Sequence, residues 1–303
     1  MQTHNVKRAF TRDKYLWLML VLPLAYFVIF HYVPMGGLIM AFQDYSPLRG
    51  ILGSRWVGFQ YFIQFFTSPN FSRTVWNTFY LSFLTLIFGF PAPILLALLI
   101  NECDFRKYKK VSQTISYMPH FISTVVIVGM LFNFFNPVTG VVNVLLKSLG
   151  HSTINFMGEP KYFRALYVGS NIWQFAGWTS IIYLSTLSSL DPELYEAAVI
   201  DGASRWKMLI KITVPQIVPV ISIMFILRMG SLMSIGFEKI ILMYGPATYE
   251  VADVISTYVY RRALLEARFG FGTAIGLFNS VINTALLLIF NTLSRKMSEY
   301  SLW

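Results

Sequence analysis

The chain has 303 residues, of which 55% are hydrophobic and only 13% are charged. Soluble domains carry roughly 25% charged residues, so the composition excludes an ordinary soluble protein. The formal net charge of +10 does not indicate nucleic-acid binding, because the basic residues flank apolar runs, where anionic lipid headgroups account for them. We therefore expect a lipid bilayer, and no nucleic acid, as the partner of this charge.

Six apolar runs follow one another along the chain. A bilayer core of about 30 Å needs roughly 20 apolar residues in a helix. Runs this long predict helices rather than the short alternating strands of a barrel. The predicted fold is all-α and polytopic, with one transmembrane domain over residues 1–303. The predicted spans are 15–42, 75–100, 111–134, 163–190, 214–233 and 272–293.

The first run resembles a signal peptide, but it is too long and lacks a small-x-small cleavage site, so we expect a retained anchor. Orientation follows from the basic residues, which concentrate in cytoplasmic loops. With the N-terminus inside, the short inner segments hold 13 of the 24 Lys and Arg residues, and the much longer outer segments hold nine, Lys239 among them. Both termini and the loop 191–213 are therefore predicted to be cytoplasmic.

That loop, between the fourth and fifth spans, predicts two short helices set at an angle. Its glycine is expected to end the first helix, and its alanines leave a small surface for close approach by a partner. Two carboxylates are available to basic groups of a partner, and a tryptophan adds apolar bulk to the second helix. A plain amphipathic helix lying on the membrane is the simpler alternative. The predicted docking residues are Glu196, Ala197, Ala198, Asp201, Gly202, Trp206 and Pro215.

The spacing Glu-Ala-Ala, then Asp-Gly-Ala, then Val214-Pro215, resembles the EAA loop of permease subunits from ATP-binding-cassette importers. In that family the loop docks on the ATPase subunit. The segments 236–246 and 252–261 look like the sugar-permease branch that handles oligosaccharides. The resemblance implies a type I importer permease fold in a bacterial plasma membrane, with uptake of oligosaccharides, uronate-containing ones among them.

The same resemblance implies several partners: a second homologous permease in a heterodimer, two ABC ATPase subunits and an extracellular sugar-binding protein. No Gly-x-x-x-x-Gly-Lys-Ser/Thr loop occurs in the sequence, so we expect no ATP binding, no cofactor and no enzymatic activity in this chain. The resemblance implies alternating access, in which closure of the ATPase pair moves the loop and reorients the helices.

A sugar pathway needs hydrogen-bonding groups and aromatic faces inside the helix bundle. The candidates are Asn171, Trp173, Gln174, Trp178, Arg228, Ser231, Asn279 and Asn283. Asn and Ser also join helices to one another, and Trp residues also anchor helices at the membrane interface. Arg228 falls in the outer half of the fifth span. Because intramembrane charges usually face the bundle or water, we predict that Arg228 faces an outer cavity and pairs with an acidic sugar. Snorkelling or pairing with Glu238 is the alternative.

Three other functions are weighed against the permease. A secondary transporter usually carries acidic residues in the membrane, but all 14 Asp and Glu residues lie outside the six predicted spans. A membrane-embedded enzyme needs a cluster of His, Asp or Glu near one face, and the spacing shows none. A permease for amino acids, peptides or phosphate stays open, although the resemblance favours sugars.

Overall fold

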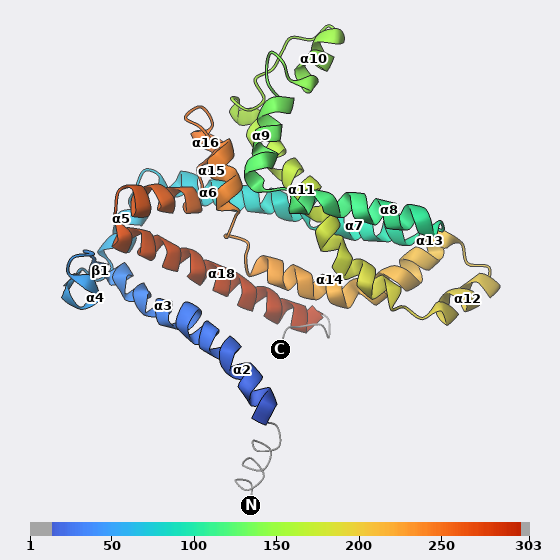
Figure 1. Cartoon of the computed structure of the whole chain (residues 1–303), viewed down its shortest axis with the longest axis horizontal. Coiled ribbons are helices and arrows are strands. Elements are labelled where there is room, and N and C mark those ends of the chain that lie inside the picture. The colour runs from blue at the N-terminus through green and yellow to red at the C-terminus, as the bar shows by residue number, and fades with distance from the viewer. Residues whose placement is uncertain (1–13, 298–303) are drawn as a thin grey trace, which may run out of the picture. The chain divides into compact units, whose positions relative to one another are not determined.

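The computed structural model describes residues 14–297, which are mostly helical (Figure 1). Within that range the strands are β1 (Gln43–Asp44) and β2 (Arg55–Trp56), which pair antiparallel with Gln43 opposite Trp56. The described residues divide into two compact units. The first comprises 14–67 and 259–278, and the second comprises 68–258 and 279–297.

The first unit begins with a helix whose apolar side chains have little protein around them. None of the side chains of α2 is buried, as expected for a helix that lipid or another subunit covers. Further along, Gly270 permits a close backbone approach, because a Cβ there would collide with the Gln43 carbonyl oxygen. The elements are α2 (Lys14–Phe27), η1 (Val28–Tyr32), α3 (Val33–Met35), η2 (Gly36–Phe42), β1, α4 (Gly50–Gly53), β2, α5 (Gln60–Phe66), η6 (Tyr260–Leu265) and the first turns of α18 (Phe269–Met297).

The second unit is organised around the 29-residue helix α11 (Pro160–Ser188). Its buried Tyr183, Leu184 and Leu187 pack with Ala97 and Ile217 from two other helices. The remaining elements are α6 (Phe71–Leu84), η3 (Thr85–Gly89), α7 (Pro91–Asn101), α8 (Arg106–Tyr117), η4 (Met118–Phe121), α9 (Thr124–Phe134), α10 (Val141–Ser148), α12 (Pro192–Ile200), α13 (Arg205–Met208), η5 (Leu209–Thr213), α14 (Val214–Met229), α15 (Phe237–Met243), α16 (Tyr249–Ala252), α17 (Ile255–Val259) and the rest of α18.

Four helices of the described range are long and apolar enough to cross a membrane: Lys14–Phe42, Phe71–Asn101, Arg205–Met229 and Phe269–Lys296. A bent pair, Arg106–Phe121 with Thr124–Phe134, makes up to five. The prediction of a mostly helical polytopic protein is confirmed. The predicted fourth span corresponds to α11, which is long enough to cross but is not among these apolar helices. The chain ends, on which the predicted cytoplasmic placement partly depends, lie outside the described residues.

Two predicted spans differ from the helices observed. The third, predicted as one helix over 111–134, bends by 99°. Its η4 turn contains Pro119, which has no N–H to donate, and a new helix begins after Ser123, whose Oγ accepts a hydrogen bond from the Val126 N–H at 3.4 Å. The fifth helical stretch begins at Arg205 rather than at Val214.

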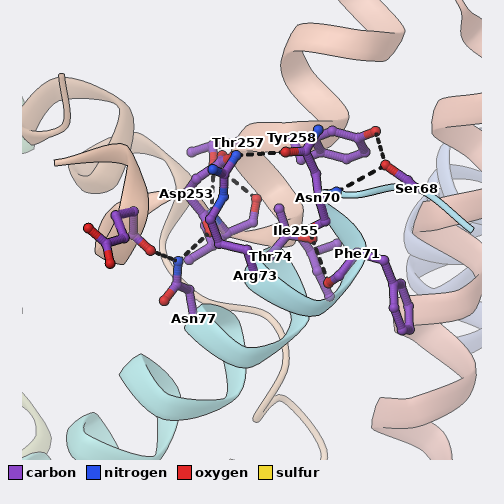
Figure 2. A network of polar contacts seen from close by, with 12 residues as sticks. Ser68, Asn70, Phe71, Arg73, Thr74, Asn77, Asp253, Ile255, Thr257 and Tyr258 are labelled. Atoms are coloured by element: carbon purple, nitrogen blue, oxygen red, sulfur yellow. Dashed lines mark hydrogen bonds and ion pairs between the residues drawn. The ribbon is translucent and has the colours of Figure 1, made fainter. Parts of the chain in front are cut away.

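A buried polar network anchors the segment between α16 and α17 to α6 (Figure 2). Asp253 is fully buried, accepts a hydrogen bond from Thr257 Oγ1 at 2.9 Å, and lies 3.6 Å from Arg73 Nη2. Asn77 Nδ2 donates to the carbonyl oxygens of Glu250 and Asp253, at 2.8 and 3.1 Å. These bonds satisfy backbone groups that the helix break would otherwise leave unpaired.

Candidate docking loop and substrate cavity

The first half of the loop 191–213 is the helix α12. Asp191 Oδ1 caps its start by accepting a hydrogen bond from the Glu193 N–H at 2.9 Å. Gly202 follows its end with φ +71°, a conformation that costs glycine least. The Ala203 N–H donates to the Ala198 carbonyl at 2.9 Å, and the Gly202 N–H donates to the Val199 carbonyl at 3.0 Å. This pair of bonds is a Schellman motif, so the prediction of a glycine-terminated helix is confirmed.

The second half of the loop begins with α13. Ser204 Oγ caps it by accepting a hydrogen bond from the Lys207 N–H at 3.3 Å. The helix then continues through η5 into α14 and ends at Met229. The predicted second short helix is therefore the start of the fifth helical stretch, and Pro215 lies within that stretch rather than at its beginning. The second half of the loop and α14 are therefore parts of one continuous helical stretch.

The surface of this loop is exposed over both halves. Glu196, Ala197 and Asp201 are exposed. The side chains of Ile200 and Trp206 are 86% and 70% exposed. Large exposed apolar side chains beside carboxylates are typical of a surface that a partner covers.

Two side-chain contacts hold the loop to its surroundings. Arg205 Nη2 donates to Asp104 Oδ2 at 2.9 Å, and both side chains are largely exposed. The hydroxyls of Tyr195 and Thr213 lie 3.0 Å apart, and Thr213 is fully buried. The first contact links the loop to the segment between α7 and α8, and the second links its first half to its second half, while its exposed face remains available.

The second candidate site is a cavity of about 500 Å³ inside the second unit, a volume within the range of small-molecule sites. Side chains from η3, α7, α11, α14 and the segment 234–236 line it. Arg228 and Asn171 are among the lining residues, and no carboxylate is. The hydroxyl of Tyr183, which also belongs to the lining, is buried without a hydrogen-bond partner. The cavity therefore combines a mostly apolar lining with a few hydrogen-bonding side chains and one positive charge.

Arg228 lies in the last turn of α14 and reaches the cavity. Its neighbour there is Tyr167, whose hydroxyl also lies next to Asn171 and the Gly236 backbone. Among the described residues no carboxylate lies within ion-pair distance of Arg228, so the alternative pairing with Glu238 is not observed. The guanidinium is left to face the cavity.

The other predicted pathway residues have different neighbours. Gln174 is buried and donates through Nε2 to the Ile122 carbonyl at 3.2 Å, at the bend between η4 and α9. Asn283 accepts from the Met233 N–H and donates to Ser234 Oγ, both at 2.8 Å. Ser231 Oγ donates to the Arg228 carbonyl at 3.2 Å. In Gln174 and Asn283 the polar side chain joins protein segments, which is the alternative that the sequence left open, whereas the Ser231 hydroxyl bonds to the backbone at the end of its own helix.

The remaining three candidates do not line this cavity either. Trp173 borders a separate apolar cavity of about 320 Å³ between α9 and α11. Trp178 stacks on His120, with ring centroids 4.4 Å apart. Asn279 Oδ1 is buried without a partner. Of the eight predicted pathway residues, the structure brings only Asn171 and Arg228 together on the 500 Å³ cavity.

Sequence reasoning missed three residues at this site. Tyr167 and Tyr183 line the cavity, and Lys239 stands directly behind it. Lys239 was assigned to an outer loop, yet its side chain is only 4% exposed. The available signal was a lone lysine in the otherwise apolar stretch that follows Glu238. That signal is weak, because a lysine in a loop is ordinarily solvated.

An internal cavity with a positively charged side chain, and an exposed loop continuous with a long apolar helix, define the class, a polytopic membrane transport protein. Comparison with known proteins gives the family. The chain belongs to the binding-protein-dependent transport system inner membrane component family, which matches residues 89–299. The resemblance to importer permeases is confirmed, and the chain is a membrane component of a transport system rather than an enzyme.

Three relatives are similar over nearly the whole chain. Protein LplB of Bacillus subtilis is 43% identical over 97% of this chain and 93% of that protein. The polygalacturonan/rhamnogalacturonan transport system permease protein YteP of B. subtilis is 42% identical over 96% of this chain and 91% of its own length. A chain of a bacterial alginate ABC transporter, crystallised with an alginate pentasaccharide-bound periplasmic protein, is 45% identical with a TM-score of 0.89, covering 97% of this chain and 99% of that one.

Proposed function

We propose that this chain is a transmembrane subunit of an ATP-driven, binding-protein-dependent importer that moves oligosaccharides, acidic ones included, across a bacterial plasma membrane. It crosses the membrane six times, with α11 and the bent pair among the spans and with both termini in the cytoplasm. It pairs with a second, homologous permease, and two ABC ATPase subunits bind the cytoplasmic loops. An extracellular sugar-binding protein delivers the cargo.

The charge of the cavity is the observation that supports an acidic cargo. Arg228 faces the cavity with no carboxylate in the lining, and charged residues within membrane-spanning segments are costly and usually mark a substrate or ion pathway. The relatives support this reading, because one transports polygalacturonan or rhamnogalacturonan and another belongs to a transporter that imports the acidic polysaccharide alginate. They favour sugars over amino acids, peptides and phosphate.

The continuity of the docking loop with α14 supports alternating access. The loop leads into the same helical stretch that ends with Arg228 in its last turn. A displacement of the loop by the ATPase pair therefore tilts or shifts the helix that carries the charged wall of the cavity. Since packed helices have discrete arrangements rather than a continuum, such a shift opens the cavity to one side of the membrane at a time.

The test is the ATPase activity of the reconstituted complex with its binding protein, loaded either with trigalacturonate or with the same trisaccharide as its neutral methyl ester. We expect stimulation by the loaded binding protein, larger for trigalacturonate. Stimulation only by the binding protein loaded with the ester would contradict the acidic cargo but would be consistent with an oligosaccharide importer. A complex that neither sugar stimulates would contradict oligosaccharide import.

Arg228→Gln is expected to lower trigalacturonate uptake selectively. A charge-assisted hydrogen bond contributes about 1.5–3 kcal/mol, which corresponds to a loss of roughly 10- to 100-fold. Uptake of the methyl ester should change little. Radiolabelled uptake into proteoliposomes measures both, and Arg49→Gln, which removes an exposed arginine, is the matched control. An equal loss for both sugars would show that Arg228 has a structural role only.

A further inference from the structure

Lys239 is a buried cation held by two amide oxygens. Its Nζ donates to Asn171 Oδ1 at 2.9 Å and to Gln174 Oε1 at 2.8 Å, and it lies 5.6 Å from the centroid of the Phe175 ring. Only 4% of the residue is exposed, and no carboxylate of the described residues pairs with it. Burying a charge without an opposite charge is costly. A neutral side chain could join α15 to α11 at a lower cost in free energy, so a purely structural role does not explain a lysine here.

The hydrogen bond from Lys239 fixes the orientation of the Asn171 side-chain amide. An ammonium group only donates, and an asparagine amide has one acceptor oxygen and one donor nitrogen. With Oδ1 bound to Lys239, Asn171 turns its Nδ2 donors to other groups, and its side chain already forms a hydrogen bond with the Tyr167 hydroxyl. Asn171 lines the cavity beside the Tyr167 hydroxyl. The same wall includes Phe175, whose ring lies near the ammonium.

The charge of Lys239 also acts on the cavity, although the side chain does not line it. Asn171 and Phe175 line the cavity, and both also contact the ammonium. Charges in a low-dielectric surrounding interact over longer distances than charges in water. Arg228 in the lining and Lys239 next to the lining are two positive charges, and the lining holds no carboxylate to balance them.

We propose that Lys239 is a positioning residue that makes the pathway selective for carboxylate-bearing sugars, by presenting Asn171 to the cavity as a donor and by adding a second positive charge behind its wall. This inference rests on the proposed import of acidic oligosaccharides through this cavity. If Lys239 only joined α15 to α11, its loss would affect acidic and neutral sugars equally.

The experiment compares uptake of trigalacturonate and of its methyl ester by the reconstituted complex, with the same binding protein throughout, so that the preference of the binding protein cancels between variants. Lys239→Met is expected to lower the ratio of acidic to neutral uptake by about tenfold, the effect of 1.4 kcal/mol. Lys161→Gln, which removes an exposed lysine at the start of α11, should keep the wild-type ratio.

Lys239→Gln carries the test if Lys239→Met fails to fold. Its amide nitrogen can still donate to Asn171 Oδ1, so the contact between α15 and α11 is retained while the positive charge is removed. The ratio of acidic to neutral uptake should still fall, because the charge beside the cavity wall is lost. A wild-type ratio in either folded variant would overturn the inference and leave the proposed function intact. A wild-type complex that takes up neither sugar would overturn both.

Discussion

Gly202→Asp is expected to abolish transport and the coupling of ATP hydrolysis while leaving the protein folded and inserted. The glycine has φ +71°, and no atom lies within 4 Å of the position a Cβ would take. Within this chain the substitution therefore costs only backbone strain, about 1–2 kcal/mol. In the proposed complex it places a carboxylate in the contact with the ATPase. An unpaired charge buried there costs about 3–5 kcal/mol, which lowers the affinity between loop and ATPase by more than roughly 100-fold.

The control for Gly202→Asp is Gly150→Asp. Gly150 has φ +83° and is equally free of neighbours within 4 Å, but it lies after α10, in a predicted outer loop. Both variants thus carry the same kind of backbone strain, and only one changes the docking surface. Binding-protein-stimulated ATPase activity and uptake into proteoliposomes provide the measurement. Wild-type coupling in Gly202→Asp would refute the docking role, and equal losses in the two variants would assign the effect to strain.

Gly177→Leu is expected to prevent correct packing of the second unit. Gly177 is buried where α11 crosses α8, and a Cβ there would overlap the Ser116 carbonyl and lie 2.9 Å from the Ser116 Cβ. The carbonyl is backbone in a helix, so it cannot rotate away, and the two helices would have to separate. Overpacking of one side chain costs about 1–3 kcal/mol, and leucine at a helix contact made by a glycine should reach or exceed the upper value.

Gly169→Leu on the same helix is the matched control. A Cβ at Gly169 meets no atom within 4 Å, so the substitution replaces a flexible residue with a good helix former at an open position. The melting temperature of the purified protein in detergent and its size-exclusion profile compare the two. We expect a lower melting temperature or aggregation for Gly177→Leu, and an unchanged or slightly higher melting temperature for Gly169→Leu. Similar behaviour of the two would contradict the close crossing of α8 and α11.

Features that depend on neighbouring residues in the chain were predictable. The Schellman motif after α12 needs one glycine and bonds that span five residues at most, so Gly202 could be placed from its sequence context. Long apolar runs predict helices for a similarly local reason, since each backbone bond closes within one turn. The bend after Pro119 was harder to predict from the sequence. Proline permits a break in a helix, but contacts with distant residues determine where the chain turns.

The polar residues of the pathway were the least predictable. Asn171 and Gln174 are three residues apart on α11 and look alike in sequence, yet Asn171 lines the cavity while Gln174 bridges the bend and Lys239. Asn283 was a reasonable pathway candidate, but it binds the chain that follows α14 instead. Which side of a helix faces a cavity depends on where other helices lie, and that information is distributed over distant parts of the chain.

The sequence by itself determined that the chain is a helical membrane protein of an importer family, because composition and local spacing are sufficient for both. The same local spacing led to the prediction that the loop 191–213 carries the docking residues. Only the tertiary structure decided that Arg228, Asn171 and Tyr167 share one cavity and that Lys239 is buried behind it. The physical reason is that burial and electrostatic surroundings arise from packing between segments such as α11, α14 and α15, which the order of residues along the chain does not display.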